Sequence, residues 1–163
     1  MDIQDICDRV VAYQPRYVTV TGGEPLAQKE ALPLLIRLCD ADYEVSLETS
    51  GSLDLHGVDP RVIIVMDIKT PGSGEAEKNR WDNLQQLSSK DQIKFVICDR
   101  EDYDWAKLQM QERELPGRCE VLFSPAQACL APAMLADWIL QDNLPVRFQL
   151  QLHKILWGDE AGR

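Results

Sequence analysis

Basic side chains are scarce in this sequence. The 163 residues include 17 Lys and Arg against 27 Asp and Glu, which gives a formal net charge of -10. Binding to nucleic acid needs clustered positive charge to meet the phosphates, so this composition argues against a nucleic-acid partner. A small molecule or another protein is the partner that suits an acidic chain of this kind.

Long apolar runs and regular cysteine spacings are also missing. No apolar stretch reaches the ~20 residues that span a bilayer, and the first residues do not form a secretory signal. The cysteines are odd in number, and no pair has metal-finger spacing: Cys7, Cys39, Cys98, Cys119 and Cys129. Free thiols are typical of a reducing compartment. We therefore predict a cytoplasmic protein without a membrane span.

Repeats and interdomain linkers are absent as well, and the length suits one domain covering residues 1–163. What is present is an alternation of two hydrophobic periods. The helical period marks 3–11, 31–39, 102–112, 131–139 and, more weakly, 79–87, whereas strand-like runs lie at 17–20, 45–49, 62–68, 92–97, 120–123 and 146–152. Continuous apolar runs predict strands covered on both faces. The alternation predicts an α/β fold with a parallel sheet, either doubly wound or curled as a barrel.

Polar residues follow the predicted strands where each strand ends. Glu24 comes after the first strand, Glu48 ends the second, Lys69 follows the third and Gln127 follows the fifth. Because the carboxyl ends of parallel strands share one edge, we expect these side chains to form the site there. The Gly-rich segment 70–74 follows Lys69 and is predicted to be a ligand-binding loop.

Each of these residues also has a purely structural interpretation. Gly22 and Gly23 would serve any tight turn, and Asp67 with Lys69 could form an ion pair without a ligand. His153, between apolar neighbours, would be a hydrogen-bonded imidazole in most proteins. These alternatives stay open on composition and pattern alone.

Five segments, taken together and in order, carry a resemblance to a known family. They are Thr-Gly-Gly-Glu-Pro at 21–25, Glu-Thr-Ser-Gly at 48–51, Asp-Ile-Lys-Thr-Pro-Gly-Ser-Gly at 67–74, Phe-Ser-Pro at 123–125 and Gln-Leu-His-Lys at 151–154. The set resembles the 7-carboxy-7-deazaguanine synthases, which are radical S-adenosylmethionine lyases of queuosine biosynthesis. The resemblance implies a partial (β/α) barrel of the radical S-adenosylmethionine type, a parallel sheet with helices outside. It also implies conversion of 6-carboxy-5,6,7,8-tetrahydropterin to 7-carboxy-7-deazaguanine with loss of ammonia.

The resemblance further assigns ligands to individual positions, without identifying a catalytic residue. Those implied to bind S-adenosylmethionine are Gly22, Gly23, Glu24, Ser50, Asp67, Lys69, Ser124, Pro125, Ala126 and Gln127. Those implied to bind the pterin are Thr21, Glu48 and His153. A [4Fe-4S] cluster, Mg²⁺ and a homodimeric assembly are implied by the family alone.

The sequence departs from the family in one respect. A cluster of this class is held by three thiolates in a Cys-x-x-x-Cys-x-x-Cys loop, and this spacing does not occur here. We therefore expect a radical S-adenosylmethionine core lacking its first strand and cluster loop, without metal ligands and inactive as an isolated chain. Three explanations remain open: an incomplete form of the synthase, a cluster-free S-adenosylmethionine or pterin-binding module or partner subunit, and a different radical enzyme that shares Gly-Gly-Glu-Pro.

Overall fold

The computed structural model describes residues 2–158, with the side chain of His153 left aside. The strands are β1 (Tyr17–Val20), β2 (Glu44–Thr49), β3 (Ile63–Ile68), β4 (Gln92–Ile97), β5 (Glu120–Pro125) and β6 (Arg147–Phe148). The α-helices are α1 (Ile3–Tyr13), α2 (Ala31–Asp40), α3 (Arg100–Glu112), α4 (Pro132–Gln141) and α5 (Leu152–Trp157). Short 3-10 helices are η1 (Pro25–Ala27), η2 (Pro71–Ser73), η3 (Ala76–Lys78), η4 (Trp81–Gln86) and η5 (Leu115–Gly117).

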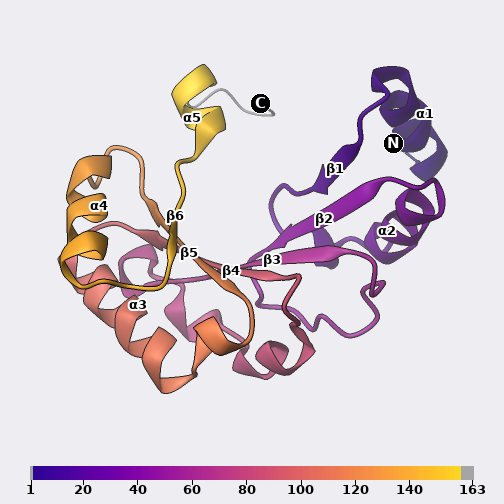
Figure 1. Cartoon of the computed structure of the whole chain (residues 1–163). Helices are drawn as coiled ribbons and strands as arrows, with labels where there is room; N and C mark the ends of the chain where they lie inside the picture. Colours follow the sequence, from indigo (N-terminus) through magenta and orange to yellow (C-terminus); the bar gives the residue numbers. More distant parts are fainter. Residues whose placement is uncertain (1, 159–163) are drawn as a thin grey trace.

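The strands form one parallel sheet in the order of the chain, β1-β2-β3-β4-β5-β6. A doubly wound sheet reverses its direction of growth at a switch point, and this sheet does not. Continued addition on one side is the topology of a barrel. Figure 1 shows the strands as a curved array, with α3 and α4 beside β4 and β5, and α1 and α2 beside β1 and β2. The predicted α/β fold with a barrel-like parallel sheet is confirmed.

The prediction that the strands are covered on both faces is wrong for β2, β3 and β4, but it holds for β5, where residues 121–125 are all buried. Along β3 and β4, fully buried residues alternate with half-buried ones, as they do in a sheet packed on one side. The buried face includes Met66, Phe95 and Phe123. The other, polar face includes Glu48 and Lys94. The apolar residues of β3 point alternately to both faces of the sheet, which is why the sequence suggested cover on both. The helices cover only the outer face.

The core lies between the sheet and the helices on its outer side. Tyr103 of α3 and Leu135 of α4 are fully buried against β4 and β5. The rings of Phe95 and Phe123 meet edge to face, with centroids 5.5 Å apart. A second cluster joins Leu35 and its neighbours on α2 to β2. These contacts fix the strands whose carboxyl ends carry the predicted site residues.

Two predicted elements differ from the structure. The strand predicted at 146–152 is confined to Arg147–Phe148, and the chain then turns into α5 from Leu152. The weak helix predicted at 79–87 is the 3-10 helix η4. In Figure 1, α5 lies away from α3 and α4, beyond the end of β6. Across residues 2–158, none of the helices has the length and apolar character needed to cross a membrane.

Candidate functional site

Glu24 ties the turn after β1 to the end of β2. Its Oε1 accepts hydrogen bonds from the backbone N–H of Leu26 at 3.1 Å and the hydroxyl of Thr49 at 2.9 Å. Its Oε2 accepts from the backbone N–H of Ser50 at 2.8 Å and from the hydroxyl groups of Thr49 and Ser50. A carboxylate offers about four acceptor positions, so these donors occupy them. Glu24 therefore shapes the turn, and its predicted contact with S-adenosylmethionine stays a prediction.

The two glycines before Glu24 leave the turn open. Gly22 and Gly23 have φ values of 101° and 53°, which favour glycine. A Cβ atom on either residue would meet no heavy atom within 4 Å. A ligand can therefore approach this backbone closely.

The hydrogen bonds to Glu24 also predict how stability depends on pH. Burial opposes ionisation of Glu24, but donation from Ser50, Thr49 and the backbone outweighs burial and lowers the pKa. A group whose folded pKa is lowered stabilises the protein above its unfolded pKa, about 4.3 for Glu, and loses that contribution as the pH falls through the folded pKa. Between pH 7 and pH 3, the Glu24→Gln variant should lose less unfolding free energy than the wild type in urea titrations.

The matched control for this measurement is Glu30→Gln. Glu30 is exposed and its side chain makes no capping bond to α2. This variant should keep the pH dependence of the wild type. Equal pH dependence in Glu24→Gln and the wild type would contradict the role of the Glu24 hydrogen bonds.

Asp67 and Lys69 lie where β3 ends. Lys69 Nζ is 2.7 Å from Asp67 Oδ2, so the two form the ion pair that the sequence allowed. The backbone of Lys69 is held by Asn79, which accepts from its N–H at 2.9 Å and donates to its carbonyl at 2.8 Å. Asp67 Oδ1 is buried without a hydrogen-bond partner. An unpaired buried acceptor of this kind suits a ligand that donates.

The Gly-rich segment after Lys69 is fixed by a residue that sequence reasoning missed. Asp102, in the first turn of α3, is 1% exposed and accepts from the backbone N–H of Gly72 at 2.7 Å and of Cys98 at 3.0 Å. The hydroxyl of Thr70 donates to the carbonyl of Val96 at 3.1 Å. The segment is therefore anchored to β4 and α3. An acidic residue soon after the helix cap Asp99 is the one signal that could have pointed to it.

A small polar pocket opens on the concave face of the sheet. Its volume is about 230 Å³, and it is lined by Glu48, Lys94, Ser124, Gln149, Leu150, Gln151 and Leu152. The hydroxyl of Thr21 is 3.5 Å from Glu48 Oε2, so the two predicted pterin-binding residues with described side chains meet here. Lys94 was missed because its strand was interpreted only as an apolar run. Its Nζ lies 3.8 Å from Glu48 Oε2.

The remaining predicted positions are dispersed around this edge. Ser124 lines the pocket with Glu48 instead of joining the turn at Glu24. Pro125 ends β5, and the N–H of Ala126 donates to the carbonyl of Ile97 at 2.8 Å. Gln127 is exposed. His153 belongs to α5, but its side chain lies outside the described part.

Comparison with known proteins identifies the relatives of this chain. It is 43% identical to the 7-carboxy-7-deazaguanine synthase of Chlorobaculum tepidum, over 99% of this chain and 74% of the relative. The synthase of Koribacter versatilis is 41% identical, over 88% of this chain and 70% of the relative. The chain belongs to the 7-carboxy-7-deazaguanine synthase family. No family model matches it.

Solved structures share the fold of this synthase-family chain. The crystal structure of QueE from Escherichia coli superposes with a TM-score of 0.71 at 18% identity, over 93% of this chain and 64% of QueE. Streptococcus suis SuiB, bound to S-adenosylmethionine, gives a TM-score of 0.63 at 14% identity, over 93% of this chain and 42% of SuiB. The chain thus spans less than two thirds of either solved protein. The fold is that of the radical S-adenosylmethionine enzymes, and family membership overturns the explanation by a different radical enzyme.

The described residues of this synthase-family chain do not fit the metal groups of the family. Cys39 and Cys119 are buried at separate elements, Cys7 lies on α1, and Cys98 and Cys129 follow β4 and β5. Within residues 2–158, no three His, Cys, Asp or Glu side chains are placed to hold a metal ion. These residues therefore offer no set of three thiolates for a [4Fe-4S] cluster.

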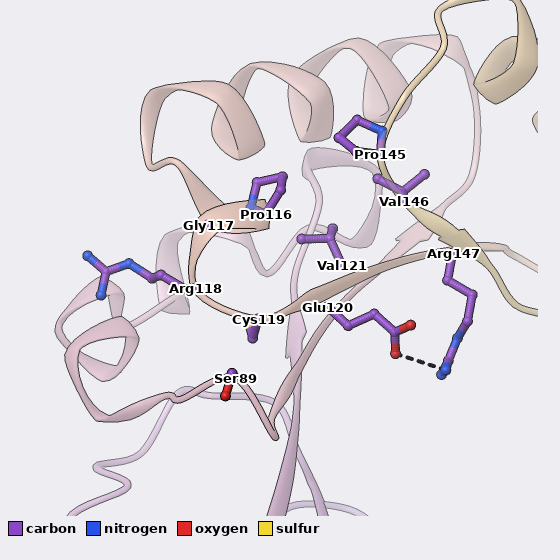
Figure 2. Close-up of a pocket in the computed structure, with 10 residues that line it drawn as sticks. All are labelled: Ser89, Pro116, Gly117, Arg118, Cys119, Glu120, Val121, Pro145, Val146 and Arg147. Atoms are coloured by element: carbon purple, nitrogen blue, oxygen red, sulfur yellow. Dashed lines mark ion pairs between the residues drawn. The ribbon is translucent and has the colours of Figure 1, made fainter.

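A larger pocket, of about 640 Å³, lies at the other end of the strands. Figure 2 shows it among residues that precede or begin β4, β5 and β6, with Glu120 and Arg147 paired at 2.8 Å. None of the predicted site residues lines it. In parallel α/β sheets the ligands bind at the carboxyl edge, so this synthase-family chain has its candidate site at the opposite edge.

Proposed function

We propose that the protein has the activity of the 7-carboxy-7-deazaguanine synthase family. It converts 6-carboxy-5,6,7,8-tetrahydropterin to 7-carboxy-7-deazaguanine with loss of ammonia, and this chain supplies its S-adenosylmethionine and pterin pockets. The observation that carries the proposal is the joining of motif segments at one sheet edge. Glu24 accepts from Thr49 and Ser50, and Thr21 approaches Glu48. Together with 43% identity to a named synthase, this supports a site of that family.

The residues of the chain bind and orient the two small molecules. The Gly22-Gly23 turn, held by Glu24, receives the methionine end of S-adenosylmethionine, and Asp67 with Lys69 borders the same edge. Glu48 and Thr21 hold the pterin in the concave pocket. With S-adenosylmethionine bound and one electron delivered by a reduced iron-sulfur cluster, the cofactor would supply the radical chemistry for hydrogen removal. The protein contributes position and exclusion of water.

A second candidate is a cluster-free module that binds the cofactor or the pterin without catalysis. The observation that favours it is that no three of the five cysteines gather: Cys98 and Cys129 contact each other, and the other three lie on separate elements. Both candidates use the same pockets. They differ in whether these pockets serve a catalysed reaction or binding alone.

Titration calorimetry separates these candidates, and anaerobic iron-sulfur reconstitution tests the interpretation of the cysteines that both share. Because no three described thiols gather, the isolated chain should show no cluster absorbance and form no 5′-deoxyadenosine. Binding of S-adenosylmethionine should be weak, since chelation by a cluster iron is absent from the chain. Turnover by this polypeptide would contradict our interpretation of the cysteines. Low-micromolar binding of S-adenosylmethionine would favour the binding module.

Two further features remain proposals. We infer a homodimer, which is supported by exposed apolar side chains on α5, among them Ile155 at 61% and Trp157 at 46% exposed. Light scattering of the purified chain tests this. A cytoplasmic location is supported by the cysteines, because each one that the structure describes is a free thiol.

A further inference from the structure

The concave face carries a lysine to which no function has been attached so far. Lys94 lies within β4, in register with Asp67 of β3. Its side chain is 15% exposed, which is unusual for lysine unless a partner compensates. The nearest ion-pair partner is Glu48 of β2, with Oε2 at 3.8 Å from Nζ. Two opposite charges thus lie side by side on the face that faces away from the helices.

The distance between these charges leaves both side chains able to bind a third group. A direct hydrogen bond between ammonium and carboxylate measures about 2.7–2.9 Å, so at 3.8 Å the two attract without satisfying each other. An ammonium has three donors, and a carboxylate only accepts. Glu48 and Lys94 both line the pocket of about 230 Å³, so their remaining donors and acceptors share one small space.

A third polar group in this pocket also lacks a partner. Ser124 is 1% exposed, and its hydroxyl oxygen is buried without a hydrogen bond. It lines the pocket together with Glu48 and Lys94. Buried hydroxyl groups are nearly always paired in native proteins, so an unpaired one beside two charged groups points to a polar ligand.

We propose that Lys94 is a substrate-binding residue that donates a hydrogen bond to the ring carbonyl of the pterin. This inference rests on the proposed function. The 2-amino-4-oxo pyrimidine ring of a pterin presents a carbonyl oxygen next to two N–H donors. Glu48 accepts from the N–H donors, and Lys94 donates to the carbonyl. The neighbouring charges of Glu48 and Lys94 therefore match the neighbouring donors and acceptor on this edge of the ring.

The assignment makes Lys94 a determinant of specificity. A 2,4-diaminopteridine replaces the carbonyl by an amino group, which places a donor against the ammonium of Lys94. It also replaces the ring N–H by a bare nitrogen, which weakens its contact with Glu48, so the change on Lys94→Met is the part of the preference that belongs to Lys94. Sites built around a hydrogen bond reject such analogues strongly, because their own buried group is left unpaired. A merely electrostatic role for Lys94, through Glu48, would weaken both kinds of ring alike.

Fluorescence titration with two stable probes tests this on the full chain. 6-Carboxypterin and 2,4-diaminopteridine-6-carboxylic acid should bind the wild type with at least about tenfold preference for the former. Lys94→Met should weaken 6-carboxypterin by about tenfold to a hundredfold and leave the diamino compound nearly unchanged, as expected for loss of one charge-assisted hydrogen bond. Lys94→Arg should recover part of the preference.

Lys107→Met serves as the matched control. Lys107 also has a carboxylate partner, Asp142 at 2.6 Å, but it lies on α3, outside the sheet. This variant should bind both probes as the wild type does.

Two outcomes overturn the inference in different ways. The role of Lys94 is overturned, and the proposed function stands, if wild type binds 6-carboxypterin without preferring it. The same holds if a folded Lys94→Met variant keeps the preference of the wild type. Wild type that binds neither probe overturns the pterin pocket and the role of Lys94 together. Lys94→Arg, which keeps the positive charge and the donors, gives a second measurement of the preference if Lys94→Met does not fold.

Discussion

Replacing Asp102 by alanine should lower the free energy of unfolding by about 3 kcal/mol, because a buried carboxylate that accepts two backbone N–H groups is removed. The two donors belong to Gly72 and Cys98, which lie in separate loops, so the loss would detach both from α3. Asp102 is 1% exposed, so water does not compensate at its position. Urea unfolding followed by circular dichroism measures the effect.

Asp104→Ala provides the comparison within the same helix. Asp104 is exposed and pairs with Arg100 one turn earlier at 2.9 Å. Such a surface pair contributes about 0.3–0.5 kcal/mol. Similar losses in Asp102→Ala and Asp104→Ala would show that the anchoring of the 70–74 segment does not depend on the buried carboxylate.

Replacing Gly51 by alanine should lower the free energy of unfolding by about 2–4 kcal/mol, from left-handed backbone strain and overpacking together. Gly51 has a φ of 66°, and a Cβ there would lie 2.7 Å from Cγ of Met66. Met66 is fully buried, so it has little room to move. The substitution would also disturb the turn after β2, where Ser50 donates to Glu24.

Gly74→Ala isolates the backbone contribution to this loss. Gly74 has a φ of 70°, but a Cβ there would meet no atom within 4 Å. This variant should lose about 1 kcal/mol, from strain alone. Thermal and urea unfolding of both variants checks the difference. Equal losses would show that contact with Met66 is unimportant.

The motif segments contain glycines that packing requires. Gly51 closes the Glu-Thr-Ser-Gly segment, and Gly72 lies in the segment that follows Lys69. Both glycines are required by packing: a Cβ on Gly72 would lie 2.6 Å from Oδ2 of Asp102. A motif of this family therefore mixes residues that suit a ligand with residues that fix the backbone beside it.

Sequence reasoning located the strands and the edge that carries the site, but it missed the residues that act between elements. Glu24 and Glu48 were found because polar residues directly after or within an apolar strand stand out in the sequence. Lys94 was not found, because its strand was interpreted only as an apolar run and its closeness to Glu48 depends on a pairing of strands that the sequence does not align. Asp102 was not found, because its partners lie in two loops that meet only in the folded chain.

The sequence by itself determined the alternation of helices and strands, the parallel sheet and the edge at which polar groups collect. Hydrophobic periodicity and the rule that parallel strands share their carboxyl edge are sufficient for that. Only the tertiary structure decided which face of the sheet stays open, where β6 gives way to α5, and that Glu48, Lys94 and Ser124 share a pocket. The physical reason is that side-chain pairing across strands depends on register and curvature, and a local pattern specifies neither.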